Sequence, residues 1–476
     1  MKCAVDFILT FAEENFLEID DREMLARSAM AAFSLIREIN GQSRASPPLI
    51  LTVAEREGCL LLNFLNHGMP IIQGGSSGID GYLKRHQVSP ERFDGISVEN
   101  LGREGQVISL RMSLGKSAIP LSVVEEKADR EELTLEEDSI EIRELRDGEE
   151  GALSRLFYHV YGYNYINDFI YFPEKVHALI KEGKLISIVG AAPNGRLVGH
   201  VGLMRKNDRP LVLEPCLGVT DPHVKSRGLF GRIFQATMER GALLPVSYYF
   251  FDFVTNHDLS QRLINRYGCI DMAIFLACQN RNTQAKLSDL GIGMDPKGTD
   301  RYSILYSVIP RVKNPFGREV FLPNNLGQML GFLLEPLEMR WMPCPRFSIL
   351  ASEGAYTLSR EPAQQMAMFD CAQPGLSALE GIIKDWQHLE KDGYKYAAVD
   401  IPLEASGLGS THEFLALQGF FPAGFVPHRC SDRLAIRFQT VAPSKLDFSE
   451  IIVFSEQGKK LLRLIKDNYE RNIPHE

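Results

Sequence analysis

The stretch from Leu211 to Gln235 constrains the fold of this chain most. Its first half, 211–219, is apolar, is broken by Pro215, and has the length of a buried strand. Its second half carries apolar residues at helical spacing after a glycine-containing turn. A strand that passes through such a turn into a helix presents backbone N–H groups and the positive end of the helix dipole. The stretch is therefore predicted to bind an anion such as a diphosphate.

The turn itself adds charge and glycine to this arrangement. It contains Lys225, Ser226, Arg227, Gly228, Leu229, Phe230 and Gly231. This segment resembles motif A of the GNAT superfamily of N-acetyltransferases, in which Arg/Gln-x-x-Gly-x-Gly/Ala follows a strand and grips the diphosphate of acetyl-CoA. Lys225 fills the Arg/Gln place, Gly228 the first glycine, and Phe230 the second small position. The resemblance implies acetyl-CoA as cofactor and these seven residues as its binding loop; a strand–turn–helix with a packing glycine is the alternative.

The order of the flanking segments extends the resemblance over residues 140–280. Residues 185–192 and 197–204 read as a hairpin, 247–254 as a buried strand, and 256–268 as a helix that ends in glycine. This is the acetyltransferase order of elements. The resemblance implies that Asn256 lies beside the pantetheine arm, and that the backbone amides of Leu217 and Val219 polarise the thioester carbonyl.

Acyl transfer to an amine needs a base for the amine proton and an acid for the coenzyme thiolate. Glu214 stands on the predicted strand where the superfamily often places its base; a surface carboxylate ahead of Pro215 is an equal alternative. The family's usual acid, a tyrosine four residues before the helix-ending glycine, is replaced by Ile264. Tyr267, nearer that glycine, is the candidate acid instead.

Aromatic residues crowd the segment from Tyr158 to Glu174. In the superfamily, the segment between the first two strands lines the acceptor pocket. The tyrosines could form an amphipathic wall for an amine substrate. The alternative is aromatic packing in the core.

Residues 1–120 form a separate unit with predicted helices at 7–14 and 21–40 and strands at 49–54, 59–65 and 107–112. Together with the glycines of 74–78, they resemble the histidine-kinase-type ATPase fold, and more narrowly the anti-sigma-factor serine-kinase branch. Asn66 replaces the family's adenine-binding Asp, and Phe33 its magnesium-binding Asn. The unit is therefore interpreted as a non-catalytic module for regulation or dimerisation, with a divergent nucleotide sensor as the alternative.

The remaining boundaries follow from composition and an internal repeat. Residues 121–138 are a charge-rich linker, 139–309 the GNAT domain, 310–345 a connector, and 346–476 a degenerate second GNAT-like half with a closing helix at 455–471. This half has no Lys/Arg-x-x-Gly loop, so it is predicted to bind no coenzyme. The predicted class is a multidomain α+β or α/β protein.

Composition limits the classes of partner. The net charge of −9 argues against nucleic-acid binding. The eight cysteines include no Cys-x-x-Cys pair, so reduced thiols and no metal site are expected. No signal peptide or membrane-length apolar run is present, so a cytoplasmic protein without membrane contact is expected.

These observations predict an acetyl-CoA-dependent N-acetyltransferase that acts on a small-molecule or protein amine in a ternary complex. The alternative from another class is a partner-switching protein, in which the N-terminal module binds a regulatory protein or a second copy and the GNAT fold only senses acyl-CoA. A fully degenerate scaffold is the third interpretation, because the usual acid is missing at Ile264.

Overall fold

The computed structural model describes residues 49–56, 59–68, 93–113, 139–163, 165–205, 212–222, 224, 228–280, 301–344, 350–428, 433–442 and 446–472. Several sequence predictions lie outside these residues. They are the two helices before residue 49, the glycines of 74–78, the linker and the three turn residues Lys225, Ser226 and Arg227.

The chain divides into two compact units. Unit 1 comprises Met1–Val201 and Gly218–Ile233, and unit 2 comprises Gly202–Leu217 and Phe234–Glu476. Three elements therefore contribute residues to both units: β7 (Leu197–Arg205), β8 (Val212–Thr220) and α6 (Leu229–Ala242).

The first part of unit 1 is a four-stranded antiparallel sheet in the order β1-β2-β4-β3. Its strands are β1 (Ile50–Arg56), β2 (Cys59–Asn66), β3 (Gly95–Asn100) and β4 (Gln106–Ser113). Leu62 and Phe64 of β2 and Ile108 and Leu110 of β4 are buried, which is the alternation of a sheet with one covered face. The strands predicted in this region are thus present, and β3 is an addition.

The second part of unit 1 holds the elements that precede the hairpin of β6 and β7. They are β5 (Glu141–Glu144), α4 (Glu150–Tyr161), η4 (Asp168–Tyr171), α5 (Pro173–Lys181) and β6 (Leu185–Ala191). Helix α4 ends at Gly162, which has a positive φ of 61°. Its inner stripe of Leu153, Leu156, Phe157 and Val160 is buried.

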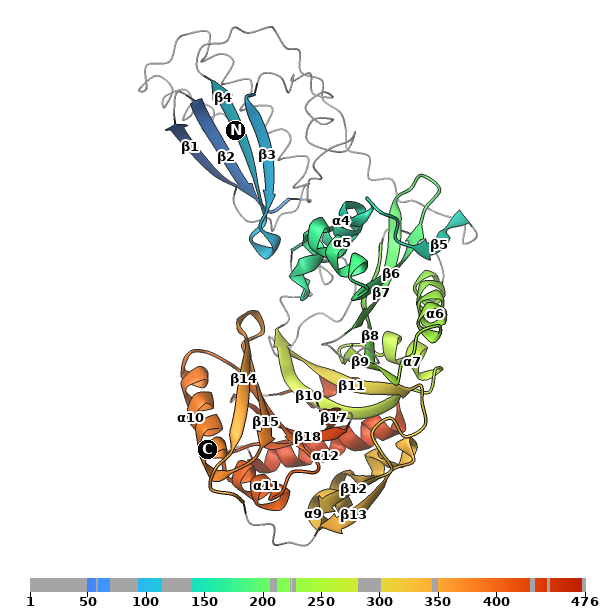
Figure 1. The fold of residues 1–476 in the computed structure, drawn as a ribbon, viewed down its shortest axis with the longest axis vertical. Coiled ribbons are helices and arrows are strands. Elements are labelled where there is room, and N and C mark those ends of the chain that lie inside the picture. The colour runs from blue at the N-terminus through green and yellow to red at the C-terminus, as the bar shows by residue number, and fades with distance from the viewer. Residues whose placement is uncertain are drawn as a thin grey trace. The chain divides into compact units, whose positions relative to one another are not determined.

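Twelve strands of the described chain share one sheet, in the order β14-β15-β16-β18-β17-β10-β11-β9-β8-β7-β6-β5 (Figure 1). Three further strands of this sheet lie in the predicted GNAT domain: β9 (Tyr248–Val254), β10 (Ile270–Asn280) and β11 (Arg301–Pro310). Helix α7 (Leu259–Asn265) lies between β9 and β10 in the chain. Strand β8 is parallel to β9, whereas β9, β11 and β10 are joined antiparallel.

The C-terminal part of unit 2 supplies the other strands of that sheet. Its elements are β14 (Ala355–Glu361), β15 (Met366–Gln373), α10 (Leu376–Lys391), β16 (Tyr396–Pro402), α11 (Leu408–Leu417), β17 (Phe421–Pro427), β18 (Leu434–Val441) and α12 (Glu456–Asn472). Strand β15 is parallel to β16, as β8 is to β9. Helix α12 packs on β10 and β17 (Figure 1).

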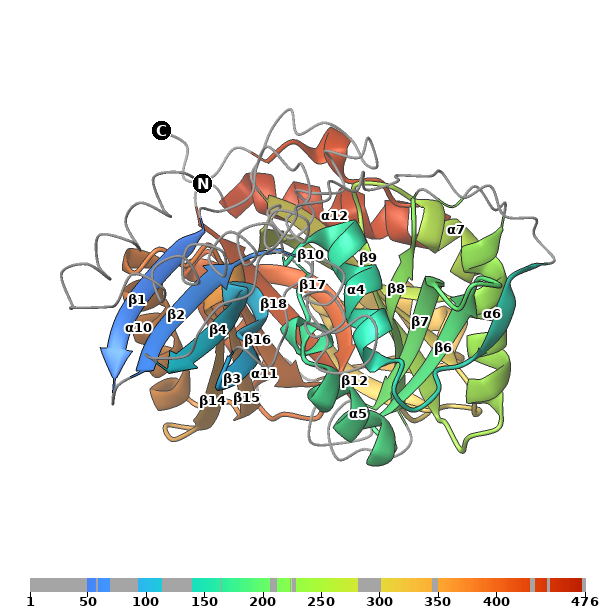
Figure 2. The same cartoon turned by 90° about the horizontal axis from the view of Figure 1, so that it is seen from above.

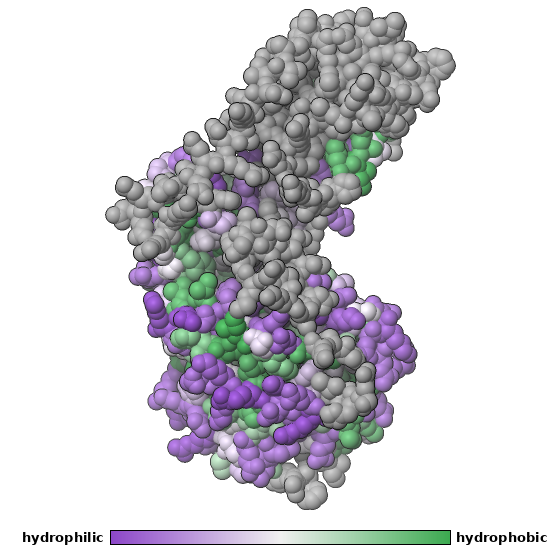
Figure 3. All heavy atoms as spheres, turned by 180° about the vertical axis from the view of Figure 1, so that it is seen from behind, coloured by the Kyte–Doolittle hydropathy of each residue, from purple (hydrophilic) through white to green (hydrophobic). Residues whose placement is uncertain are grey.

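The region predicted as a connector has structure of its own. Strands β12 (Glu319–Pro323) and β13 (Arg340–Cys344) form a two-stranded parallel ribbon. Helix α9 (Asn324–Leu330) lies between them in the chain and packs on both. Trp341 lies over Gly327 and Gly331, which have no side chain to obstruct it. On the face drawn in Figure 3, the coloured residues include both hydrophilic and apolar areas. Phe321 of the ribbon is 60% exposed.

Candidate active site

Strands β8 and β9 separate soon after they meet. Their parallel register comprises only Val212 with Tyr248 and Leu213 with Tyr249, although both strands continue through described residues. Leu217 has a φ of 54°, a left-handed conformation that is uncommon for a residue with a side chain, so the path of β8 is distorted there. A gap between two parallel strands thus begins at Glu214.

The end of β8 leads into the turn and the first residues of α6. Gly228 precedes the helix with a φ of +73°, and a Cβ added there would have no atom of the described residues within 4 Å. The first turn of any helix has N–H groups without an intrahelical acceptor, and it carries the positive end of the dipole. No described residue therefore obstructs Gly228 at the start of α6, and binding of a diphosphate requires such access.

Phe230 departs from the small residue expected at its position, and the structure shows where its ring goes. A Cβ on Gly218 would lie 3.0 Å from the Phe230 ring, so this ring packs on the backbone of β8. Helix α6 is also held close to the sheet, as Figure 2 shows beside β6 and β7. Ile233 lies against both Gly190 and Gly199, where added Cβ atoms would come within 3.1 and 2.5 Å of its Cδ1. Glycines in two strands therefore fix the position of the helix N-terminus.

An ion pair fastens the end of β8. Arg196 donates to Asp221, whose side chain is 1% exposed. The backbone N–H of Asp221 also bonds to the carbonyl of Val198 at 2.9 Å. The last residues before the turn are thus held in place by a charge-assisted bond and a backbone bond.

Glu214 faces a cluster of aromatic and charged side chains in unit 2. It is half-buried on β8, and its charge contributes to the shifted pKa of Tyr306 on β11. Burial first, then Tyr248 and the carboxylates of Asp252 and Glu214, raise the pKa of Tyr306 well above its usual value. Glu214 therefore lies on the face of the sheet that carries Tyr306.

Tyr267 lies on the opposite face. Its ring meets Phe234 of α6 edge-on at 5.4 Å, and Phe234 in turn packs on Phe251 of β9. Phe251 points away from its neighbour Asp252, because successive residues of a strand face opposite sides. The predicted base and acid are thus not neighbours but lie on the two sides of the sheet.

The helix expected to begin at Asn256 begins later. Helix α7 runs Leu259–Asn265 with Asp258 at its N-cap and no capping bond from that side chain. Asn256 is half-buried in the segment between β9 and α7. The expected role of Asn256 beside the pantetheine arm stays a prediction, as do the roles of the amides of Leu217 and Val219.

Most of the aromatic segment packs on itself. Tyr161 and Tyr165 have ring centroids 4.7 Å apart, and both rings contact Phe157. Burial raises the pKa of Tyr161 to about 12, so this phenol stays protonated at neutral pH. Its hydroxyl donates to the carbonyl of Gly218 at 3.4 Å. These rings thus pack on one another, and the hydroxyl of Tyr161 contacts β8.

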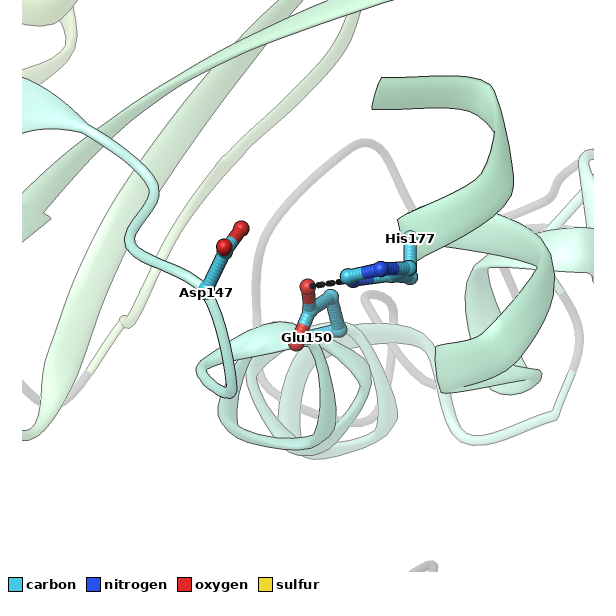
Figure 4. A group of neighbouring side chains, drawn as sticks. All are labelled: Asp147, Glu150 and His177. Atoms are coloured by element: carbon cyan, nitrogen blue, oxygen red, sulfur yellow. Dashed lines mark hydrogen bonds and ion pairs between the residues drawn. The ribbon is translucent and has the colours of Figure 1, made fainter. Parts of the chain in front are cut away.

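Asp147, Glu150 and His177 form a group with the residue types of a metal site (Figure 4). Their ligand atoms all lie within 4.8 Å of one another. His177 Nδ1 is 2.8 Å from Glu150 Oε1, and Lys181 Nζ is 2.8 Å from Asp147 Oδ2. Lys181 already supplies a cation to the group, so we interpret it as an ion-pair network that joins α5 to the start of α4.

The corresponding turn in the C-terminal half is closed. A Cβ on Gly375, just before α10, would lie 2.1 Å from the carbonyl oxygen of Glu353. The N–H groups of Leu376 and Ser377 bond to the carbonyls of Ala351 and Ser352 at 2.8 and 3.0 Å. Chain atoms therefore occupy the place that an anion would take at the start of α10.

The parallel pair in that half also stays closed for longer. Strands β15 and β16 pair over five residues, from Met366–Tyr396 to Asp370–Asp400. In the predicted GNAT domain, β8 and β9 form only two such residue pairs before they separate. The echo between the two halves thus extends to the parallel strands but not to the gap.

In the N-terminal sheet, the side chain of Asn66 forms hydrogen bonds within the protein. Its side chain is buried, and its Oδ1 accepts from Gly68 N and Gln106 Nε2 at 3.1 Å each. Its Nδ2 donates to the carbonyl of Gln106 at 3.4 Å. The side chain at the position expected to bind adenine is therefore hydrogen-bonded to Gly68 and Gln106 of the protein itself.

Sequence reasoning missed three residues on the Glu214 face: Asp252, Tyr306 and Arg437. The sequence contained one indication, because Asp252 is the sole charged residue in the aromatic run of β9. Arg437 comes from β18, more than 200 positions after Glu214. Their proximity depends on sheet order, which local sequence patterns do not contain.

Comparisons with known proteins find similarity in structure only. No protein-family model matches the chain, and no curated protein matches it in sequence. Ribosomal-protein-S5-alanine acetyltransferase from Vibrio fischeri is 12% identical, with a TM-score of 0.28, over 38% of this chain and 97% of that one. Phosphinothricin acetyltransferase of the GNAT superfamily from Sinorhizobium meliloti, solved with acetyl-CoA, is 10% identical, with a TM-score of 0.28, over 36% and 88%.

A GNAT family N-acetyltransferase from Escherichia coli, solved with CoA, is 12% identical, with a TM-score of 0.24, over 37% of this chain and 83% of that one. These neighbours are therefore GNAT proteins that match a part of the chain at low identity. Separately, the helices of the described residues include none with the length and apolar character needed to cross a bilayer.

Proposed function

We propose that the chain is an acetyl-CoA-dependent N-acetyltransferase. The observation that supports this most is strand β8, which parts from β9 after Leu213 and is followed in the chain by Gly228 at the start of α6, where no described residue lies within 4 Å of an added Cβ. A gap beside a strand can admit a narrow pantetheine chain, and a helix N-terminus can bind a diphosphate. One strand thus carries the features for both ends of the coenzyme.

In this proposal, acetyl-CoA supplies an activated acetyl group on sulfur. Glu214 accepts the proton of the acceptor amine, so that the nitrogen lone pair attacks the thioester carbonyl. The carbon–sulfur bond then breaks, and the thiolate takes up a proton. Tyr267 is the proposed proton donor, and its place on the face opposite Glu214 would bring acid and base to the gap from two sides.

Calorimetry with the full chain tests the proposal. Acetyl-CoA should bind at one site per chain, and at least tenfold more tightly than S-acetyl-pantetheine, which lacks the diphosphate. Thiol release in the presence of amines should accompany binding. Absence of acetyl-CoA binding at millimolar concentration would refute the proposal, and binding without turnover of any amine would favour the acyl-CoA sensor.

We propose further that the N-terminal sheet is a regulatory module without nucleotide chemistry. Support comes from Asn66, whose amide oxygen and nitrogen are both engaged with Gly68 and Gln106. Titration of the full chain with ATP or ADP and magnesium should give no heat of binding. Saturable nucleotide binding that Asn66→Ala abolishes would contradict this proposal.

A further inference from the structure

Within unit 1, the tip of the β3–β4 hairpin contacts the aromatic segment that follows α4. Asn100 Nδ2 donates to the carbonyl of Tyr171, and Asn100 Oδ1 accepts from Gly102 N at 3.3 Å. Gly102 has a φ of +59°, and a Cβ added there would lie 2.6 Å from the ring of Phe172. The hairpin tip is therefore joined to the aromatic segment by a hydrogen bond and by close packing against a ring.

A second contact between the same two parts leaves polar atoms unpaired. Tyr158 donates from its hydroxyl to the carbonyl of His67 at 2.9 Å, and the ring of His67 meets that of Tyr163 edge-on at 6.2 Å. The Tyr163 hydroxyl and His67 Nδ1 are buried, and neither atom has a hydrogen-bond partner among the described residues. Such atoms cost free energy, which water would recover if the two surfaces separated. This cost favours a contact that can open.

A continuous set of contacts leads from the hairpin tip to β8. The hydroxyl of Tyr171 accepts from Tyr165 N at 3.1 Å, and the ring of Tyr165 packs on that of Tyr161. The hydroxyl of Tyr161 donates to Gly218 O at 3.4 Å. All of these residues belong to unit 1. Three tyrosines therefore connect the side chain of Asn100 to the backbone of β8.

The Gly218 carbonyl lies on the edge of β8 that faces away from β7. Asp221 N bonds to Val198 O of β7 at 2.9 Å. Backbone groups of successive residues in a strand point alternately to its two neighbours. Gly218 is an odd number of positions before Asp221, so its backbone groups point to the other edge. That edge is the one from which β9 separates after Leu213.

We infer that the N-terminal sheet restrains the proposed coenzyme site, because the hairpin tip holds Tyr161 on a carbonyl that the coenzyme would otherwise use. The inference rests on the proposed function, in which the pantetheine chain enters the gap beside β8. Pantetheine contains two amides, and an amide N–H in such a gap needs a hydrogen-bond acceptor. Gly218 O is an acceptor at this edge, and the hydroxyl of Tyr161 is bonded to it. Release of Asn100 from Tyr171 therefore frees Tyr161 and strengthens coenzyme binding.

Calorimetry with acetyl-CoA tests the inference on four forms of the full chain: native, Asn100→Asp, Tyr161→Phe and the double variant. Asn100→Asp keeps the oxygen that accepts from Gly102 N and turns the donor to Tyr171 O into a repelling oxygen. Tyr161→Phe removes only the hydroxyl. Each change should tighten acetyl-CoA binding about twofold to tenfold, the effect of one competing hydrogen bond. The double variant should bind no more tightly than Tyr161→Phe, because both changes act on one bond.

Asn194→Asp is the matched control for the change of an amide to a carboxylate. Asn194 is exposed in the turn between β6 and β7, and its side-chain oxygen accepts from Arg196 N at 3.0 Å. This bond resembles the one from Gly102 N to Asn100, and an aspartate keeps the acceptor at both positions. Asn194→Asp should therefore leave the affinity for acetyl-CoA unchanged.

The sign of the change decides the outcome, since partial unfolding would weaken binding and cannot strengthen it. If Asn100→Asp or Tyr161→Phe leaves the affinity unchanged or lowers it, the inference is wrong and the proposed function stands. Gains that add in the double variant, or an equal gain in Asn194→Asp, would also overturn it. If none of the proteins binds acetyl-CoA, the proposed function fails and this inference fails with it.

Discussion

A pair of substitutions at Gly228 isolates the charge requirement of the turn. Gly228 has a φ of +73°, and no described residue lies within 4 Å of the position of an added Cβ. Asn and Asp are the residues that tolerate this left-handed conformation best after glycine, and they have nearly the same shape. The Gly228→Asn and Gly228→Asp variants should therefore have the same backbone strain. They differ only in one negative charge at the start of α6.

The charge acts in opposite directions on folding and on binding. A carboxylate at a helix N-terminus stabilises the helix by about 0.3–1 kcal/mol, so the Asp variant should unfold at or above the temperature of the Asn variant. Beside a bound diphosphate, the same carboxylate repels. At about 4 Å, this repulsion amounts to about 1 kcal/mol in water and about 4 kcal/mol in a partly shielded site, which weakens binding by about fivefold to a thousandfold.

Isothermal calorimetry with acetyl-CoA on both variants measures this difference, and scanning calorimetry checks the fold. The gap in affinity should shrink as salt rises from about 0.05 to 0.5 M, because screening weakens a partly exposed interaction. Equal affinities of the two variants for acetyl-CoA would mean that the diphosphate does not bind at this turn. The coenzyme assignment would then be refuted, since neither clash nor unfolding could explain the result.

Three further predictions address other parts of the chain. Glu214→Gln should lower kcat about 10²- to 10⁴-fold in steady-state assays while the acetyl-CoA affinity stays within about twofold; retained kcat would exclude Glu214 as the base. Gly375→Ala should destabilise the protein by about 1–3 kcal/mol in urea unfolding, because its Cβ would meet Glu353 O at 2.1 Å, and should leave acetyl-CoA binding unchanged. Gly95→Ala is the control for the loss of glycine, because Gly95 has no positive φ and its added Cβ would make only an ordinary contact of 3.9 Å with Arg111 Cβ. Burial raises the pKa of Asp271 in the folded protein. Its protonated form therefore contributes to the free energy of unfolding fully below the usual pKa near 4, and this contribution is lost as pH rises through the raised pKa. Asp271→Asn should remove this contribution, which changes the free energy of unfolding by at most about 1.4 kcal/mol per pH unit. If the variant and the native protein show the same pH dependence of unfolding between pH 4 and 7, the raised pKa of Asp271 is wrong.

Local patterns predicted the elements of the chain well where a period or a turn residue was present. The hairpin of β6 and β7, the strands β8 and β9, and the helices α6 and α12 lie at or within a few residues of the predicted ranges. The start of α7 was placed too early, because Asn256 lies in the bend that follows β9 and Asp258 is the residue before the helix. β12 and β13 were missed, since a parallel ribbon around a short helix has no strong alternation.

The sequence alone determined that a strand runs through a glycine turn into an amphipathic helix, because hydrophobic period and backbone freedom at glycine are local properties. The tertiary structure decided how accessible the glycine before each helix is. No described residue comes within 4 Å of a Cβ added at Gly228, whereas Gly375 is covered by the carbonyl of Glu353, a residue 22 positions away. It also placed Asp252 and Arg437 on the face of Glu214, because strand order and register bring together residues whose separation along the chain carries no information about distance.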